Sequence, residues 1–503
     1  MKKTLKTIVQ KKISMFREVY PIQEPYVFAA VVRDPITQKM RYELIEPTLL
    51  QEEEEALKEI KSILMQEVDV SLKDLETREK AEDYLRKKVE EIVKNYHVDI
   101  AKEAVSKLMY YIIREFIGYS KIDPLMKDHL IEDISADGVN IPIYVWHREY
   151  ESLPTNIVFK NAEELNSFII RLAYFAGRQI SLATPMLDAT LPDGSRIQLT
   201  YGSEITRRGS TFTIRRFRVD PLTISDLITF NTLSSGMAAY FWYIIENRAS
   251  VLVAGGVAAG KTTTLNCLSM FIKPEFKIVS VEDTAEINLP HENWIPSVVR
   301  VGAEEKGAGT ITLFDLLRAA VRQRPDFIIV GEVRGKEAYT LFQAMATGHL
   351  GLGTMHAESA EAVQQRLESE PMNIPRQMLT LIDDIVVQSR VEVHGKPTRR
   401  ITTVTEVAGL NPKTKHIRTH EVYRWNAKTD SFSCSERSLL LEKIMEIKGL
   451  NERDIQKELQ QRKTVLEWMA KNNIRRYTDV SDVIREYYAD PVRMFRKARL
   501  QTK

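Results

Sequence analysis

The sequence predicts an α/β fold for its C-terminal half, in which a parallel sheet is flanked by helices. From residue 251 onward, short apolar runs alternate with segments whose apolar residues recur at helical spacing. Three such runs are 251–253, 278–281 and 327–330. Strands that alternate with helices along a chain usually pair in parallel, because a crossover returns the chain to the same edge of the sheet.

The chain is long enough for two or three domains. It has 503 residues, of which 44% are hydrophobic and 28% charged, the balance of a globular protein with sizeable cores. The formal net charge is +2, so no overall field favours nucleic acid as a partner. The two cysteines, Cys267 and Cys434, exclude a four-cysteine zinc site and indicate a reducing compartment. No apolar run reaches the roughly 18 residues of a membrane-spanning helix.

The first 18 residues combine two kinds of side chain. Apolar residues recur at helical spacing, and lysines occupy the other side. We interpret this segment as a small helix docked on its own domain. The alternative is a basic amphipathic segment in peripheral contact with anionic lipid or with a partner. The apolar positions are Leu5, Ile8, Val9, Ile13 and Phe16.

Further patterns divide the chain into parts. Residues 25–46 alternate like a pair of strands around Asp34-Pro35. Residues 50–118 are charged with helical periodicity, which predicts a helical bundle. The predicted parts are an N-terminal helical region with a short strand pair at 1–120, a smaller α+β domain at 121–220, a linker at 221–232, and an α/β domain with C-terminal helices at 233–503.

A glycine-rich loop follows the first apolar strand. Residues 255–262 match the pattern G-x-x-x-x-G-K-[ST] between that strand and a helix-compatible run. The glycines let backbone amides point at phosphate oxygens, and the following helix adds its positive end. We predict that Lys261 bridges the β- and γ-phosphates of ATP and that Thr262 ligates Mg²⁺. The predicted nucleotide-binding residues are Gly255, Gly256, Val257, Ala258, Ala259, Gly260, Lys261, Thr262 and Thr263.

Acidic residues end two of the predicted strands. Glu282 follows the run 278–281, and Glu332 follows the run 327–330 after one glycine. A carboxylate at such a strand end, beside the phosphate loop, can hold Mg²⁺ or orient the attacking water. Either one alone would more often be a solvated strand end. Two of them in one sheet favour an active site.

Two histidines bracket a further apolar stretch, at Thr347-Gly348-His349 and Met355-His356. A lone histidine is usually structural. His356 stands at the expected end of a strand, so it is the better candidate for sensing the γ-phosphate or contacting a second subunit.

Arginines are dense between residues 196 and 218. One interpretation is a basic strand face that is solvated or meets an anionic surface. The other is a set of arginine fingers that reach a phosphate across a subunit or domain seam, each worth about 10³-fold in rate. The arginines are Arg196, Arg207, Arg208, Arg215, Arg216 and Arg218.

With these motifs, residues 120–435 closely resemble the secretion ATPases of the type II secretion and type IV pilus superfamily. Four motifs occur in the family's order: Walker A at 255–262, the Asp box at 281–284, Walker B at 317–334 and the His box at 347–356. Four other segments are similar to the archaeal branch, which includes the archaellum motor ATPase and archaeal pilus-assembly ATPases. These segments are 131–135, 144–148, 152–156 and 291–296.

The resemblance implies a RecA-like P-loop motor domain, preceded by the smaller α+β domain and the helical N-terminal region. It implies a homohexamer with ATP and Mg²⁺ at subunit interfaces. It further implies a polytopic membrane platform protein and accessory motor proteins as partners, and a cytoplasmic location at the inner face of the membrane. By the same resemblance, Glu332 lies near the metal, Glu282 lies near the attacking water, and Arg196 and Arg215 match the interface arginines.

The sequence therefore predicts an ATP hydrolase that powers assembly or rotation of an archaeal surface filament, either an archaellum or a type IV-like pilus. A conjugation-type DNA transport motor is one alternative, which the near-neutral net charge disfavours. A nucleotide-gated scaffold with little turnover is another. The acidic strand ends and the arginine-rich strand disfavour it, because a protein that only binds nucleotide needs neither.

Overall fold

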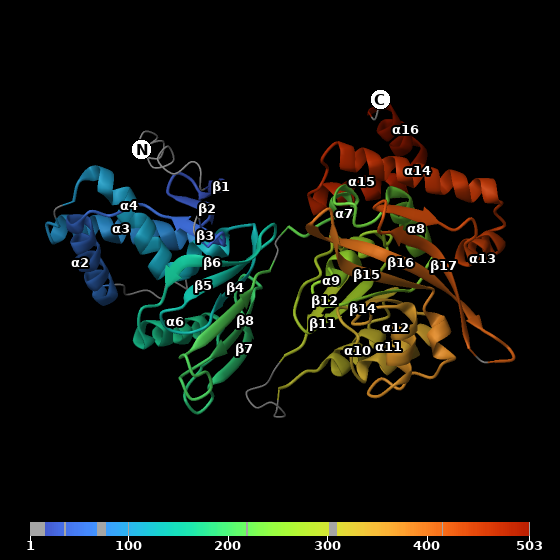
Figure 1. Ribbon diagram of the computed structural model, residues 1–503, viewed down its shortest axis with the longest axis horizontal. Helices are drawn as coiled ribbons and strands as arrows, with labels where there is room; N and C mark the ends of the chain where they lie inside the picture. Colours follow the sequence, from blue (N-terminus) through green and yellow to red (C-terminus); the bar gives the residue numbers. More distant parts are fainter. Residues whose placement is uncertain are drawn as a thin grey trace. The chain divides into compact units, whose positions relative to one another are not determined.

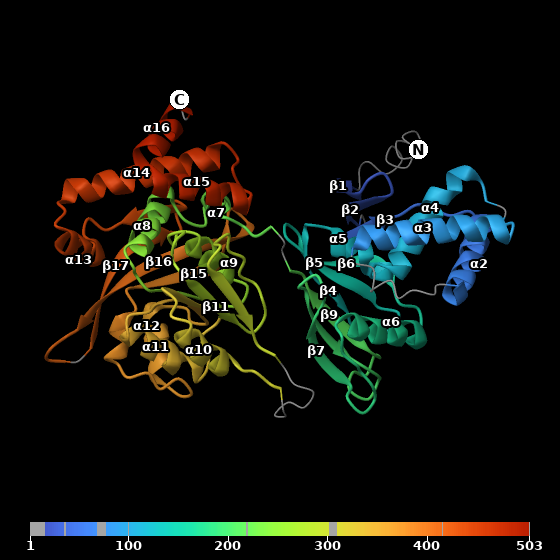
Figure 2. The same cartoon turned by 180° about the vertical axis from the view of Figure 1, so that it is seen from behind.

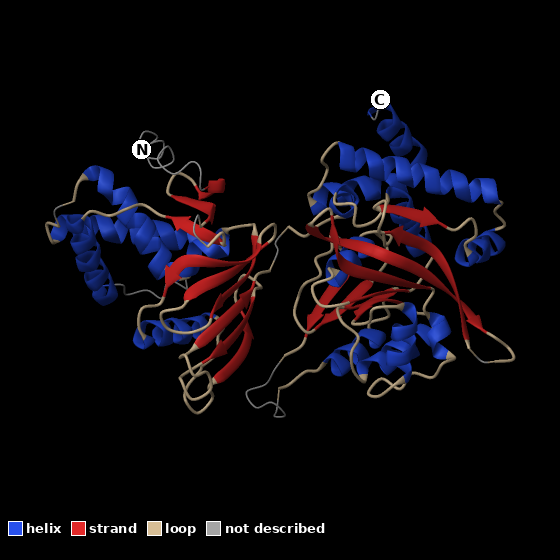
Figure 3. Cartoon of the chain, viewed as in Figure 1, coloured by secondary structure: helices blue, strands red, loops and turns tan. Residues whose placement is uncertain are grey.

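The computed structural model describes residues 16–34, 37–67, 77–98, 100–217, 220–300, 309–414 and 416–501. The chain forms two compact units, Met1–Phe217 and Arg218–Lys503 (Figure 1). Within the described residues, each unit is built around its own nine-stranded sheet (Figure 3). Most of the predicted basic N-terminal segment, residues 1–15, lies outside this description.

The sheet of the first unit has the order β1-β2-β3-β6-β5-β4-β9-β8-β7. Its neighbouring strands are antiparallel, except that β3 and β6 pair in parallel. Strands from the predicted regions 1–120 and 121–220 therefore share one sheet. The strands are β1 Phe16–Gln23, β2 Val27–Arg33, β3 Met40–Ile45, β4 Ile131–Ala136, β5 Pro142–His147, β6 Glu151–Val158, β7 Met186–Thr190, β8 Arg196–Thr200 and β9 Thr211–Arg215.

Strand β1 differs from the sequence expectation, which placed Phe16 on a helix. Residues 16–23 instead pair with β2 along their length. In this stretch Tyr20 and Ile22 pack against the core of the unit, so the local repeat is that of a strand. The predicted strand pair around Asp34 is present as β2 and β3.

Helices of the first unit form a small bundle, as the pattern over 50–118 predicts. Its core consists of apolar side chains at helical spacing, among them Ile60, Leu85 and Ile112, each fully buried. The helices are α2 Gln51–Glu67, α3 Arg78–Asn95, α4 Lys102–Phe116, the short η1 Ser120–Ile122, α5 Asp123–Lys127 and, against β8 and β9, α6 Ala162–Phe175.

The sheet of the second unit has the order β12-β11-β13-β14-β10-β15-β16-β17-β18. Strands β12 through β15 in this order pair in parallel, which confirms the predicted α/β fold. Strands β16 to β18 extend the sheet in antiparallel fashion. The strands are β10 Val251–Gly255, β11 Ile278–Glu282, β12 Trp294–Val298, β13 Phe327–Val330, β14 Leu350–Met355, β15 Asp384–Val393, β16 Lys396–Leu410, β17 Ile417–Asn426 and β18 Ser431–Cys434.

Helices cover both faces of this sheet, which explains why its central strands are apolar throughout. On β10, Val251 and Val253 join one core, whereas Leu252 and Ala254 join the other. Figures 1 and 2 show α14–α16 and α10–α12 on opposite faces. The helices are α7 Ile224–Thr229, α8 Ser235–Glu246, α9 Lys261–Ser269, α10 Leu313–Arg322, α11 Glu337–Ala346, α12 Ala360–Glu368, η2 Met378–Leu381, α13 Leu439–Lys448, α14 Glu452–Lys471, α15 Tyr477–Ala489 and α16 Pro491–Gln501.

The segment 221–232, expected as a linker, contains helix α7. Thr223 and Asp226 form a capping box that starts this helix. Ile224 and Leu227 are buried in the core of the second unit. The segment therefore packs as part of that unit, and its Thr-x-x-Asp pattern was the sequence signal for a helix start.

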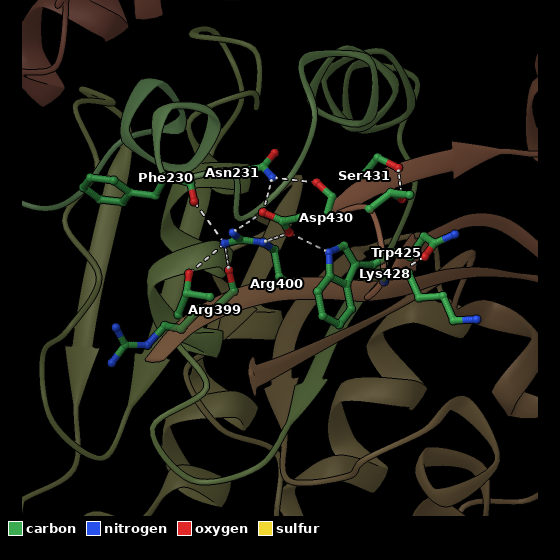
Figure 4. Close-up of polar contacts among 11 residues, drawn as sticks. Phe230, Asn231, Arg399, Arg400, Trp425, Lys428, Asp430 and Ser431 are labelled. Carbon is green, nitrogen blue, oxygen red and sulfur yellow. Dashed lines mark hydrogen bonds and ion pairs between the residues drawn. The ribbon is translucent and has the colours of Figure 1, made fainter. Parts of the chain in front are cut away.

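A buried arginine ties two distant segments to β16 (Figure 4). Arg400 is 5% exposed and forms a bidentate ion pair with Asp430, with Nε–Oδ1 at 2.8 Å and Nη2–Oδ2 at 2.9 Å. Its Nη1 donates to the Phe230 carbonyl oxygen at 3.0 Å. Asp430 also accepts from Trp425 Nε1 at 2.9 Å and from Asn231 Nδ2 at 3.1 Å. These hydrogen bonds, above all those from Arg400, lower the pKa of Asp430 below its usual range.

Candidate active site at the carboxyl edge of the second sheet

Four parallel strands bring the predicted chemistry to one edge of the second sheet. The order β11-β13-β14-β10 is continuous, and all pairings in it are parallel. The phosphate loop follows β10, His356 follows β14, Glu332 follows β13 and Glu282 ends β11. Because the carboxyl ends of parallel strands meet at one edge, residues far apart in the sequence become neighbours.

The phosphate loop passes so close to β15 that a side chain would not fit at its first glycine. A Cβ on Gly255 would lie 2.2 Å from the Gln388 carbonyl oxygen. Gly260 has a φ of +92° and directly precedes α9, where its left-handed backbone costs a glycine little. Thr264 donates its hydroxyl to Gln388 Oε1 at 2.5 Å, which fixes the first turns of α9 against β15.

The loop residues differ in exposure. Val257 is the exposed tip at 83%, whereas Ala259 is buried beneath the loop. Thr262 and Thr263 lie on the first turn of α9 and are partly buried. The loop leads directly into the start of α9, as a phosphate cradle requires. These residues fit a nucleotide phosphate.

Lys261 is at one end of a line of three side chains, which continues through His356 to Glu332. It is 8% exposed, and its Nζ donates to the Gly256 carbonyl oxygen at 2.9 Å. The same Nζ lies 3.4 Å from His356 Nδ1, and His356 Nε2 lies 3.4 Å from Glu332 Oε1. An ammonium can only donate, so Nδ1 accepts and the proton of neutral His356 is on Nε2, directed at Glu332. The imidazole therefore links the phosphate-binding lysine to the carboxylate.

The protonation of His356 follows from these neighbours. Partial burial lowers its pKa, and so does the positive charge of Lys261, whereas Glu332 raises it. Together these effects lower the pKa of His356 below the ordinary histidine value of 6.5. His356 is therefore neutral at pH 7, which leaves its Nδ1 able to accept from Lys261.

Glu282 is more deeply buried than Glu332 and is held by the chain that follows it. It is 2% exposed, and its Oε1 accepts from the backbone N–H of Glu286 at 3.0 Å and of Ile287 at 3.1 Å. A Cβ on Gly331 would lie 3.0 Å from Glu282 Cγ, so the loop that carries Glu332 passes directly beside Glu282. The geometry places both predicted carboxylates in one neighbourhood.

His349 does not belong to this line. Its Nδ1 lies 3.1 Å from the Ala344 carbonyl oxygen and 3.3 Å from Thr347 Oγ1, at the end of α11. It therefore caps the carbonyls that the helix end leaves without an intrahelical partner.

The predicted arginines belong to the first unit and divide into two kinds. Arg196 on β8 and Arg215 on β9 are exposed and stand opposite each other in the strand register. Arg216 points inward instead: its Nη1 donates to the carbonyl oxygens of Asp128 and, at 2.9 Å, of Ile131. Burial lowers the pKa of Arg216, which is a structural arginine. The exposed loop between the strands carries Arg207 and Arg208, and Arg218 lies outside the described residues.

Two residues near the phosphate loop were missed by sequence reasoning. Gln388 on β15 contacts both ends of the loop, as described above, and Arg399 on β16 donates its Nε to the Ala258 carbonyl oxygen at 3.0 Å. Neither lies in a recognisable motif. Strand pairing alone brings them to the loop.

Within the described ranges no group of three or more His, Cys, Asp or Glu side chains is arranged to hold a metal ion by itself. Mg²⁺ is usually held by one or two carboxylates together with phosphate oxygens and water, and Thr262 and Glu332 are the side chains predicted above for this role. No helix of the described residues is long and apolar enough to cross a membrane.

The arrangement predicts the titration of His356. In the wild-type protein its pKa, measured by NMR on isotope-labelled histidine and assigned with His356→Gln, should lie below 6.5. Lys261→Ala should raise this pKa because a positive neighbour is removed, and Glu332→Gln should lower it because a negative one is removed. The distant variant Lys448→Ala should leave it unchanged. A pKa indifferent to both Lys261 and Glu332 would contradict the line of contacts.

Comparison with known proteins places these motifs in a family. The family model for the type II/IV secretion system protein matches residues 118–485. The chain is 35% identical to an uncharacterized protein of Methanocaldococcus jannaschii, over 97% of this chain and 93% of that protein. It is 33% identical to a putative conjugal transfer protein of Mycobacterium tuberculosis, over 51% of this chain and 73% of that protein. It is 30% identical to the type IV secretion system protein PtlH of Bordetella pertussis, over 56% of this chain and 92% of that protein. The protein belongs to the type II/IV secretion system protein family.

Proposed function

We propose that this protein is an ATP hydrolase that drives a secretion or filament-assembly machine. The observation that carries the proposal is the line Lys261–His356–Glu332, which runs from the phosphate loop to a carboxylate at the same sheet edge. A lysine on the loop and carboxylates at neighbouring strand ends are the groups that phosphoryl transfer to water needs.

In this proposal the loop amides and Lys261 bind the β- and γ-phosphates of ATP. Thr262 and Glu332 hold Mg²⁺, which neutralises charge on the phosphate oxygens. Glu282 orients the attacking water, and the two backbone N–H groups on its Oε1 keep the carboxylate fixed for that task. His356 lies between Lys261 and Glu332, 3.4 Å from each, so it is placed to respond when Lys261 turns to a γ-phosphate.

The proposed assembly is a homohexamer with ATP at the subunit interfaces and with arginines supplied by a neighbouring subunit. Arg196 and Arg215 support this, because both are exposed, stand opposite each other in the strand register and match the interface arginines of the family. A triphosphate at a subunit interface is an anionic ligand that such arginines can bind.

The proposed output is assembly or rotation of an archaeal surface filament, an archaellum or a type IV-like pilus. The mechanical partner would be a polytopic membrane platform protein, together with accessory motor proteins, at the cytoplasmic face of the membrane. Family membership and the match along nearly the whole chain to a Methanocaldococcus protein support this proposal.

A second candidate function is conjugation-type DNA transport. The similarity to a putative conjugal transfer protein over 51% of this chain favours it. Hydrolysis stimulated by DNA would support this candidate. Hydrolysis that responds to a platform protein and is indifferent to DNA would support the filament motor. Turnover near zero would instead support a nucleotide-gated scaffold.

The chemistry is tested by two variants in the purified protein. Lys261→Ala should abolish nucleotide binding or turnover, because it removes the charge nearest the phosphates. Glu332→Gln should still bind ATP, because the loop and Lys261 are unchanged, and should lower turnover about 100-fold or more, because it removes a carboxylate that holds the Mg²⁺ needed for hydrolysis. Glu446→Gln on the exposed surface of α13 is the matched control. Near wild-type phosphate release by Glu332→Gln would exclude this active site.

The assembly is tested by mixing defective subunits. Arg215→Ala should retain nucleotide affinity and lose turnover about 10³-fold. Mixing it with Lys261→Ala should restore part of the activity, since an intact phosphate loop then meets an intact arginine of the neighbour. Mixing Lys261→Ala with Glu332→Gln should restore none, because both changes lie in the same unit of the chain. Equal recovery in both mixtures, or full activity of Arg215→Ala alone, would refute an arginine supplied in trans.

A further inference from the structure

We propose that Arg399 binds the phosphates that ATP and ADP share, from the side of the phosphate loop opposite to the catalytic carboxylates. This inference rests on the proposed nucleotide site and assigns a further binding residue to it. The starting observation is contact: Arg399 Nε donates to the Ala258 carbonyl oxygen at 3.0 Å. A Cβ on Gly260 would lie 3.1 Å from Arg399 Cδ, so the arginine side chain lies along the loop itself.

The order of the strands separates two sides of the loop. Glu332, His356 and Glu282 follow strands β13, β14 and β11, which lie on one side of β10. Hydrolysis acts on the γ-phosphate, so this phosphate belongs on the carboxylate side. The rest of the nucleotide then extends toward the other side, where β15 and β16 lie. Arg399 is on β16, so it faces the part of the nucleotide that remains after hydrolysis.

The neighbouring residue fixes the direction of the Arg399 side chain. Successive side chains of a strand point to opposite faces of the sheet. The Arg400 side chain is buried and hydrogen-bonds to the Asp430 carboxylate and the Phe230 carbonyl oxygen. Arg399 is consequently exposed, and Figure 4 shows its guanidinium directed away from the Asp430 network. Because its Nε is already held by the Ala258 carbonyl oxygen, the Arg399 side chain has less freedom to lose when a ligand binds.

Charge and hydrogen-bonding capacity then specify the ligand. Within the described residues, Nη1 and Nη2 of Arg399 make no hydrogen bond, although Nε is held by the loop. A guanidinium fork matches phosphate oxygens, which favours a phosphate over the sugar or the base.

A purely structural explanation of the same contact is that Arg399 only stabilises the loop through its hydrogen bond to Ala258. Phosphate binding and loop stabilisation require different properties of a replacement side chain. A phosphate ligand needs positive charge, which Lys keeps and Gln lacks. Stabilisation of the loop needs only an N–H donor for the carbonyl oxygen of Ala258, which Gln keeps.

The test is the affinity of the full-length protein for ADP and for ATP, measured by isothermal titration calorimetry with ATP in the Glu332→Gln background. Arg399→Ala should weaken both nucleotides by the same factor, about 10- to 100-fold, the range for a charged hydrogen bond. Arg399→Gln should be as weak as Arg399→Ala, and Arg399→Lys should recover a large part of the affinity. The matched control is Arg418→Ala, whose guanidinium also donates to a backbone carbonyl, that of Ala408.

Three results would overturn the inference: ADP affinity of Arg399→Ala within twofold of wild type, recovery by Gln in place of Lys, or a loss confined to ATP. Lys261→Ala in the same titrations separates this inference from the proposed function. If Lys261→Ala weakens ADP and Arg399→Ala does not, only the role of Arg399 is wrong. If wild type fails to bind ADP, the nucleotide site itself is wrong.

Discussion

Because β10 pairs in parallel with β14 on one side and with β15 on the other, the loop that follows it is surrounded by the ends of its neighbours. This constraint places His356 and Glu332 on one side of the loop and Arg399 on the other. It also accounts for the glycine at the start of the loop. Gly255 stands where the backbone of Gln388 approaches too closely for any side chain. The same approach fixes α9, whose Thr264 hydrogen-bonds to Gln388.

The antiparallel extension of the sheet is held by a second set of buried polar contacts. Asp384 on β15 and Glu406 on β16 are register partners, and both are buried. The Tyr240 hydroxyl lies within hydrogen-bonding distance of both carboxyl groups, at 2.8 and 2.9 Å. Burial, and next the charge of Glu406, raises the pKa of Asp384 well above its usual range. The backbone N–H of Leu439 donates to Glu406 at 2.7 Å and ties the start of α13 to β16.

The sequence predicted those parts of the fold and the site that depend on short-range patterns. The apolar runs predicted the parallel strands, and the glycine-rich loop predicted the start of α9, because strand, turn and helix follow one another directly in the chain. Contacts made by strand pairing were not predictable in this way. Arg399 and Ala258 are 141 residues apart, and no local pattern marks either residue as a partner of the other. The direction of Arg216 likewise depends on carbonyl groups of another segment, so composition alone grouped it with the exposed arginines.

The central claim is that the edge formed by β10, β13 and β14 binds ATP through its phosphates. A structure determined with Mg²⁺ and a slowly hydrolysed ATP analogue tests this most directly. The account predicts the triphosphate in the loop 255–262, with Lys261 Nζ moved from the Gly256 carbonyl oxygen to the β- and γ-phosphates. It places the γ-phosphate on the side of His356 and Glu332. An analogue bound elsewhere, or a loop in which Lys261 still donates to Gly256 at saturating analogue, would contradict the account.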